Sequence, residues 1–561
     1  MARKNASGPR LVTVIKRRRG SSGAKMPNSS VLLRLCLAVP GVLTLVHAQS
    51  RPASSGASPS SAGVRQVAYL KASNTEANDH FGNGGTLEGH GVSISGDGST
   101  LAVSAPYESS GAKGVNGDQN DNSVYSSGAV YIFVQKNGAW SQQAYIKPSN
   151  PGLSYRFGHM VSLSQDGNTL AVSAHFEASA SKGINGDQTD KSIPQAGAVY
   201  VFTRAGTTWS QQAYIKASNT GEKGIGKQPP KGDQFGFSIS LSADGNTLAA
   251  GAISEDSSAK GINGDQSDNS AVSSGAVYIY TRSGTAWSQQ AYVKASNTDA
   301  NNLFGYSVGL TADGNTMAVS AYDEAGASRQ INGPQEKGRR GSGAIYVFAR
   351  TGTKWEQTAY LKASNAEQED SLGYEIAISQ DGNTIAGGAA DEDCFAAGIN
   401  PPGCDNDYKT DASTGAVYIF VRDGGTWTQQ AFIKSSHPNK EDWFGSRLNI
   451  SGDGNTLAVG AQLENGGSKG INGNQADLSA EDSGAIYLFA RSGTTWTQKA
   501  YVKASNAEAY DEFGSAMALS RDGRLMAVGA RSEASSSKGV NGDMNDNSAM
   551  GAGALYIFAI Q

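Results

Sequence analysis

The chain has 561 residues, a formal net charge of −4, 38% hydrophobic residues and 71 glycines. This length exceeds the usual size of a single core, so the chain is either several domains or an array of repeats, and the glycine content favours short strands and tight turns over long helices. Residues 1–48 hold nine of the 46 Lys and Arg and no Asp or Glu, which leaves 37 basic against 50 acidic residues in the rest. An acidic body excludes a nucleic-acid surface, which needs clustered basic charge.

The first 48 residues have the pattern of an export signal. A basic start is followed by an apolar stretch from Val31 to Val46, broken only by Arg34, and by small residues at Val46-His47-Ala48. The apolar run after Arg34 is shorter than the roughly 20 residues of a membrane-spanning helix. We therefore expect a secreted or cell-surface protein with no transmembrane segment in the mature chain. Met26 is an alternative start, and an uncleaved anchor is the alternative to a signal.

Residues 49–63 are rich in Ser, Pro, Gly and Ala and are expected to form a flexible linker. A repeat with a period of 68 to 78 residues follows. Its marker is Ala-Tyr-(Leu/Ile/Val)-Lys, which begins at Ala68, Ala144, Ala213, Ala291, Ala359 and Ala500, with Phe432 in place of Tyr after Ala431. Seven copies fill residues 64–561.

Each copy predicts a four-stranded antiparallel meander. In the second copy the strands are expected at 161–164, 170–174, 198–202 and 209–216. An Asp-Gly pair, which is preferred in tight hairpins, separates the first two strands in every copy. These pairs are Asp97-Gly98, Asp166-Gly167, Asp244-Gly245, Asp313-Gly314, Asp381-Gly382, Asp453-Gly454 and Asp522-Gly523.

The two ends of the array predict how it closes. The last copy stops at Gln561 after its third strand, and residues 64–72 form a fourth strand that lacks the other three. Joining them completes a seventh unit and leaves no open sheet edge. The sequence therefore predicts an all-β, seven-bladed β-propeller over residues 64–561, closed by its N-terminal strand. An open solenoid is the alternative.

The repeats resemble the FG-GAP family, the propeller units of integrin α-subunits and of many exported bacterial proteins. The resemblance rests on Phe81-Gly82, Phe157-Gly158, Phe235-Gly236, Phe304-Gly305, Phe444-Gly445 and Phe513-Gly514, each followed by the Asp-Gly turn; copy five has Leu372-Gly373. It implies a seven-bladed propeller and, as in integrins, cell adhesion with calcium in an Asp-rich hairpin loop. Here that hairpin is reduced to the Asp-Gly turn, so those calcium sites are not carried over.

The polar loop between the second and third strands is the candidate metal site. Its Asp and Asn residues alternate with Gly, and a Glu precedes it in every copy; Ca²⁺ takes six to eight oxygen ligands of this kind. The alternative is that these side chains cap their own backbone in Asx turns. The candidate calcium ligands are Glu108, Asp118, Asp121, Glu177, Asp187, Asp190, Glu255, Asp265, Asp268, Glu533, Asp543 and Asp546.

Other motifs favour structure over catalysis. Cys394 and Cys404 are expected to form a disulfide in an oxidising compartment, the alternative being two free thiols. Two Gly-x-Ser-x-Gly matches, one around Ser307 and one around Ser468, lack a strand-to-helix context, and the six histidines show no metal spacing. One Trp begins the fourth strand in six copies, either as packing or, if exposed, as a platform for sugars.

We therefore expect an exported, monomeric, non-catalytic binding or adhesion propeller that engages an unidentified protein or glycan through loops at one end of the ring. A hydrolase or lyase of extracellular polysaccharide with a site at the channel mouth is one alternative. A purely structural surface protein is another. The loops of copies four and five depart most from the repeat and are the first place to look for a specific partner.

Overall fold

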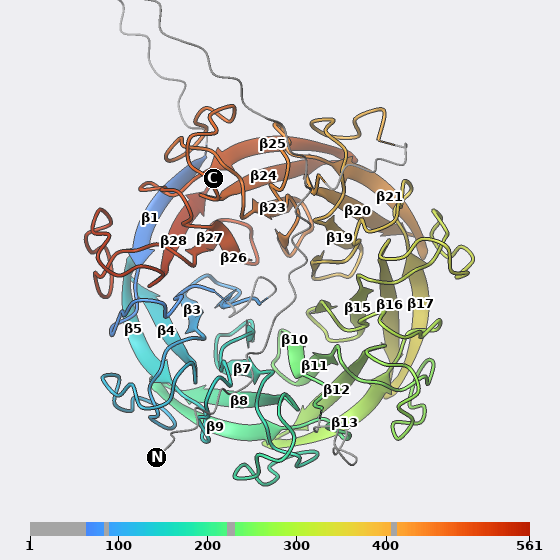
Figure 1. The fold of residues 1–561 in the computed structure, drawn as a ribbon, viewed down its shortest axis with the longest axis horizontal. Coiled ribbons are helices and arrows are strands. Elements are labelled where there is room, and N and C mark those ends of the chain that lie inside the picture. The colour runs from blue at the N-terminus through green and yellow to red at the C-terminus, as the bar shows by residue number, and fades with distance from the viewer. Residues whose placement is uncertain (1–62, 84–88, 222–230, 405–411) are drawn as a thin grey trace, which may run out of the picture. The chain divides into compact units, whose positions relative to one another are not determined.

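A computed structural model describes residues 63–83, 89–221, 231–404 and 412–561. All secondary structure there is β, and it forms seven four-stranded antiparallel sheets around a ring (Figure 1). The expected seven-bladed propeller is confirmed. The predicted export signal at 1–48 and linker residues 49–62 lie outside the described residues. No helix in the described ranges is long and apolar enough to cross a membrane.

The blades follow one another in chain order, with the first strand innermost. Blades one to three contain β2 (Val92–Ile94), β3 (Thr100–Ala105), β4 (Ala129–Lys136) and β5 (Ala139–Ile146); β6 (Val161–Leu163), β7 (Thr169–Ala174), β8 (Ala198–Ala205) and β9 (Thr208–Ile215); and β10 (Phe235–Leu241), β11 (Thr247–Ala252), β12 (Ala276–Ser283) and β13 (Ala286–Val293). Blades four and five contain β14 (Val308–Leu310), β15 (Thr316–Ala321), β16 (Ala344–Thr351) and β17 (Lys354–Leu361); and β18 (Ile376–Ile378), β19 (Thr384–Ala389), β20 (Ala416–Asp423) and β21 (Thr426–Ile433). Blades six and seven contain β22 (Arg447–Ile450), β23 (Thr456–Ala461), β24 (Ala485–Ser492) and β25 (Thr495–Val502); and β26 (Phe513–Leu519), β27 (Leu525–Ala530), β28 (Ala554–Ile560) and β1 (Val64–Leu70).

The N-terminal strand closes the ring, as the sequence predicts. β1 pairs antiparallel with β28, from Val64 opposite Ile560 to Leu70 opposite Leu555, and Figure 1 shows the blue strand beside the red one. The seventh sheet therefore joins the two ends of the array, and its outer strand covers an edge of β28 that would otherwise be a template for aggregation.

The Asp-Gly turns form as predicted. In blade two, Gly167 adopts φ +65°, and the carboxylate of Asp166 accepts hydrogen bonds from the backbone N–H of Asn168 (2.9 Å) and the hydroxyl of Ser164 (2.5 Å). A glycine tolerates this left-handed conformation, and the aspartate caps the turn. The same arrangement recurs around the ring.

The hydrophobic cores lie between neighbouring blades. Phe157, from the Phe-Gly pair of blade two, packs edge-on against Tyr200 and Phe202 of the same blade, with ring centroids 5.4 and 6.1 Å apart. Val130 and Ile132 of blade one complete this cluster. Each blade therefore buries its face on the next, as a repeat unit that is too small to fold alone must.

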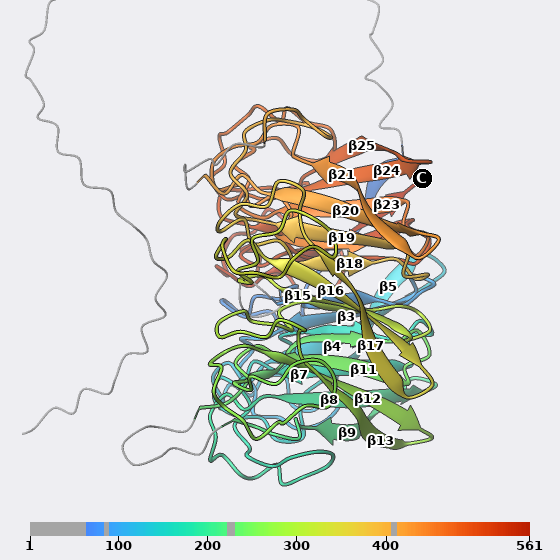
Figure 2. The ribbon, with the colours of Figure 1, turned by 90° about the vertical axis from the view of Figure 1, so that its right-hand side faces the viewer.

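The two ends of the ring differ. Tight turns join the first strand to the second and the third to the fourth, whereas long loops make the other connections. Figure 2 shows the long loops gathered at one end, the loop face, and the tight turns at the other. The loop face also carries the entrance to the innermost strands.

Candidate functional site

The predicted metal-binding glutamates lie in buried ion pairs. In blade three, Glu255 accepts hydrogen bonds from Lys294 Nζ (2.6 Å) and Tyr292 OH (2.7 Å), and both charged side chains are completely buried. Lys294 also donates to Ser274 Oγ at 2.7 Å. The same pairing occurs in all seven blades: Glu108–Lys147, Glu177–Lys216, Glu255–Lys294, Glu324–Lys362, Glu392–Lys434, Glu464–Lys503 and Glu533–Lys71.

This cluster arises from two repeated motifs. The Glu follows the second strand, and the Tyr and Lys come from Ala-Tyr-x-Lys at the end of the fourth strand. Burial lowers the pKa of Lys294 and raises the pKa of Tyr292. In blade three, Tyr292 and Lys294 occupy both oxygens of Glu255. Blade five has Phe432 in place of the Tyr. This pairing was not predicted from the sequence, although the Lys that ends every copy of the Ala-Tyr-x-Lys motif is a signal for it.

The predicted loop aspartates lie at the surface, in Asx turns. Asp118 Oδ1 accepts the N–H of Asn120 (2.9 Å), and Asp121 Oδ1 accepts that of Ser123 (3.0 Å). The Ser123 hydroxyl and nearby backbone amides hold the pKa of Asp121 below its usual value, although desolvation opposes them. Equivalent backbone bonds reach Asp187, Asp190, Asp265, Asp268, Asp543 and Asp546.

The structure does not bring the glutamate and the two aspartates of any of these four loops together. Among the described residues, the one group of three side chains whose metal-ligating atoms lie within 4.8 Å of one another is Glu392, Cys394 and Cys404. Calcium binding by the loops therefore stays a prediction, and its ligands would have to be the aspartates without the glutamates.

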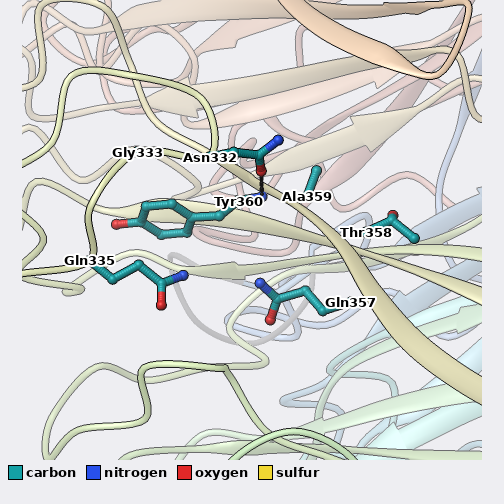
Figure 3. Close-up of a pocket in the computed structure, with 7 residues that line it drawn as sticks. All are labelled: Asn332, Gly333, Gln335, Gln357, Thr358, Ala359 and Tyr360. Atoms are coloured by element: carbon teal, nitrogen blue, oxygen red, sulfur yellow. Dashed lines mark hydrogen bonds between the residues drawn. The ribbon is translucent and has the colours of Figure 1, made fainter.

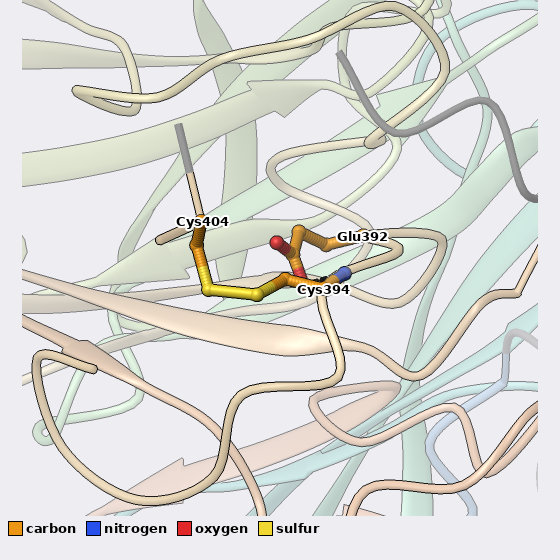
Figure 4. Close-up of side chains that lie close together, drawn as sticks. All are labelled: Glu392, Cys394 and Cys404. Atoms are coloured by element: carbon orange, nitrogen blue, oxygen red, sulfur yellow. Dashed lines mark hydrogen bonds between the residues drawn. A yellow bond between two sulfur atoms is a disulfide. The ribbon is translucent and has the colours of Figure 1, made fainter. Parts of the chain in front are cut away.

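The group in blade five contains a disulfide (Figure 4). Cys394 and Cys404 are bonded, with Cα atoms 5.6 Å apart, beside Glu392. In blade two the residue at the position of Cys394 is Ser179, whose hydroxyl fastens the same loop by donating to the carbonyl of Asp187 (2.6 Å). The disulfide thus replaces a loop-fastening hydrogen bond, and its sulfur atoms are not thiolate ligands.

The repeated tryptophans are packing residues. Trp209 is 3% exposed, and its Nε1 donates to Gln143 Oε1 of the preceding blade at 3.0 Å. Arg204 lies over the ring at 5.3 Å. The six equivalent tryptophans are 3 to 7% exposed. A platform for sugars needs exposed rings, so these buried tryptophans do not form the sugar-binding platform that the sequence left open.

The residue before each Phe-Gly pair, or before Leu372-Gly373 in blade five, differs from blade to blade. At this residue the chain enters the innermost strand on the loop face. In every copy it is a non-glycine residue with positive φ, between 52° and 61°. Such a backbone costs roughly 1 to 2 kcal/mol per residue. Seven different residue types occupy this position: His80, Arg156, Gln234, Leu303, Ser371, Trp443 and Glu512.

These side chains contact the residues that follow the second strands and form the mouth of the channel. The guanidinium of Arg156 lies 4.8 and 4.9 Å from the ring centroids of Tyr107 and Phe176. On the other side of the ring, Tyr374 lies 6.2 Å from Trp443. The mouth is therefore cationic and aromatic at blades one and two, and aromatic at blades five and six.

Below the mouth, the innermost strands enclose a cavity of about 250 Å³. His90 Nε2 of blade one lies 2.5 Å from Glu375 Oε2 of blade five, and Ser307 Oγ donates to the other Glu375 oxygen at 2.9 Å. Burial opposes ionisation of Glu375, but His90 and Arg447 hold its pKa below the usual value. Ser307, from one Gly-x-Ser-x-Gly match, thus hydrogen bonds directly to a carboxylate, and the match carries no nucleophile elbow.

The order of the blades and the closure by β1 define a closed seven-bladed β-propeller. Its scaffold repeats from blade to blade, whereas the residues at the mouth differ. Residues 287–348, 427–489 and 496–558 match the family model of the FG-GAP repeat. Three stretches of the chain are thus FG-GAP repeats within a seven-bladed propeller, in agreement with the resemblance of the Phe-Gly motifs.

No curated protein matches the chain. Similar solved structures include a putative 6-phosphogluconolactonase from Bacteroides uniformis ATCC 8492, with 11% identity over 74% of this chain and 85% of that chain and a TM-score of 0.42. The periplasmic gluconolactonase PpgL of Pseudomonas aeruginosa has 14% identity over 75% and 86%, with a TM-score of 0.40. The RRP9 WD40 repeats have 8% identity over 89% and 98%, with a TM-score of 0.44. Nothing about the function of this chain follows from these values.

Proposed function

We propose that this propeller is an exported, non-catalytic binding protein that engages a protein or glycan at the channel mouth on its loop face. The observation that carries the proposal is the ring of seven strained positions before the Phe-Gly pairs. Backbone strain is retained where the surrounding structure holds it, and it concentrates at functional sites. Glycine would relieve the strain at each position, and none of the seven is glycine.

The chemistry of the mouth supports recognition. The scaffold repeats one set of residues seven times, whereas the mouth combines a cation, aromatic rings, an amide and a carboxylate at equivalent positions. A rigid frame that presents different side chains on loops is a common design of binding proteins. In the cavity below the mouth, His90 and Glu375 pair with each other, and among the described residues no third His, Cys, Asp or Glu joins them within 4.8 Å. This favours binding over the hydrolase or lyase alternative.

Glycine variants at the mouth test the proposal, because they remove a side chain and relieve strain at the same time. We expect Trp443→Gly and Gln234→Gly to stay folded, because the relief of strain offsets part of the lost contacts and of the added chain entropy, and to lose the ligand. The control is Asn137→Gly, at a positive-φ position in a tight turn at the opposite end. The full chain and its variants are applied to arrays of glycans and of purified surface proteins.

The expected result is a ligand that the wild-type chain and Asn137→Gly retain and that both mouth variants lose. Equal binding by all four proteins would place the site elsewhere. If the wild-type chain bound no glycan and no protein on the arrays, the proposal would be contradicted.

A further inference from the structure

Blade four carries a groove on its outer wall. The groove has a volume of about 410 Å³ and is lined by Asn332, Gly333, Gln335, Gln357, Thr358, Ala359 and Tyr360. It lies where the long loop between β15 and β16 runs along the outermost strand β17. Its size is within the range of small-molecule sites, roughly 300 to 1,000 Å³.

The groove coincides with a departure from the repeat. Thr358 stands where blades one, two, three and five have Gln143, Gln212, Gln290 and Gln430. Those glutamines accept the indole N–H of the Trp in the following blade, at 2.8 to 3.0 Å. The shorter Thr358 is exposed, and within the described ranges Trp427 of blade five makes no such bond.

The lining consists of uncharged hydrogen-bonding groups that are held in place. Asn332 Oδ1 accepts the backbone N–H of Tyr360 (2.8 Å), which leaves the amide NH₂ of Asn332 for a ligand. Gln335 Nε2 donates to Ser296 Oγ (2.9 Å), and Gln357 Oε1 accepts the N–H of Ser296 (3.3 Å). Figure 3 shows the amide ends of Gln335 and Gln357 turned toward each other across the groove. Fixed amides lose little conformational entropy on binding.

We propose that this groove binds a neutral oligosaccharide. A sugar presents many hydroxyl groups that both donate and accept, and side-chain amides offer both functions. The Thr358 hydroxyl donates to the Val347 carbonyl (3.2 Å) and can still accept. No charged side chain lines the groove, which disfavours an ionic ligand, and Tyr360 is only 2% exposed, which disfavours a purely apolar one. The site is separate from the channel mouth and does not depend on the function proposed for it.

The test uses neutral oligosaccharides of glucose, xylose and mannose as probes, with uronic-acid oligosaccharides as charged controls, titrated calorimetrically into the full chain. We expect at least one neutral probe to bind, with an affinity that salt does not change. Thr358→Gln restores the repeat sequence and places a longer side chain at the wall of the groove, and Gln357→Ala removes one amide. Each should weaken binding by roughly tenfold or more, as the loss of one or two hydrogen bonds implies.

The matched control is Gln430→Thr, which makes the same change of residue in blade five, where Pro401, Pro402 and Gly403 occupy the loop. It should bind like the wild type. Melting temperatures verify that every variant is folded, and Thr358→Gln is expected to stay folded because blades one, two, three and five carry Gln at this position. No binding of any neutral probe, or undiminished binding by Thr358→Gln, overturns the proposal. Trp443→Gly separates the two sites, since it should leave this binding intact.

Discussion

Replacing Lys294 by Met tests the buried ion pairs that fasten each blade. The substitution keeps most of the apolar stem but leaves the carboxylate of Glu255 without its cation. Breaking a buried pair by removing one partner costs about 3 to 5 kcal/mol. Glu255 would keep neutral donors, namely Tyr292 OH at 2.7 Å, Asn219 Nδ2 at 3.2 Å and the N–H of Ser257 at 3.2 Å. We therefore expect the lower end of that range, about 3 kcal/mol.

Urea unfolding followed by tryptophan fluorescence measures this change, because the six blade tryptophans are buried in the native protein. Lys260→Met, at an exposed position of the same blade, should change the free energy of unfolding by less than about 0.5 kcal/mol. The double variant Glu255→Gln/Lys294→Met should lose less than the sum of the two single variants. A Lys294→Met protein as stable as the wild type would refute the reasoning that the pair is buried and coupled.

Stability should also depend on pH, ring closure and two local features. Burial and nearby acids raise the pKa of Asp79 to about 8, and burial raises the pKa of Asp442 to about 7. Both pKa values exceed the value near 3.9 in the unfolded chain, so the stabilisation by the protonated carboxyls is complete below pH 3.9 and is lost as the pH rises through 7 to 8. The melting temperature should therefore be higher at pH 5.5 than at pH 8.5. Asp79→Asn should reduce this difference in melting temperature. Deleting residues 64–70 removes β1 and exposes an edge of β28, so light scattering should show association, whereas an unchanged monomer would argue against the closure. Val67→Gln should raise the free energy of unfolding in urea by about 1 kcal/mol, because it offers an acceptor to the buried Nε1 of Trp140, which has no partner among the described residues. An unchanged free energy of unfolding would mean that the added amide does not reach the indole. If the loop aspartates bind calcium, EDTA should lower the melting temperature and Ca²⁺ should restore it, whereas an unchanged transition would count against bound metal.

The architecture could be predicted from the sequence because its signals are local and repeated seven times. Asp166-Gly167 specifies a hairpin by its own backbone preference, and the missing fourth strand at Ile560 specifies how the ring closes. The Phe-Gly pairs indicated the family for the same reason. The disulfide between Cys394 and Cys404 was also expected, since the two residues share one short loop.

Whether a polar side chain is buried in an ion pair or is available to a ligand depends on contacts between segments that are distant in the sequence. Only the tertiary structure decided these contacts. Glu255 looks like a metal ligand in the sequence, but Lys294, 39 residues further on, lies beside it once the second and fourth strands of the blade are assembled. Trp209 is covered by the preceding blade and therefore cannot stack on a sugar. Burial, desolvation and the identity of the nearest charge are properties of the assembled blades, so the residues determined the scaffold and the packing determined which of them remain available for a ligand.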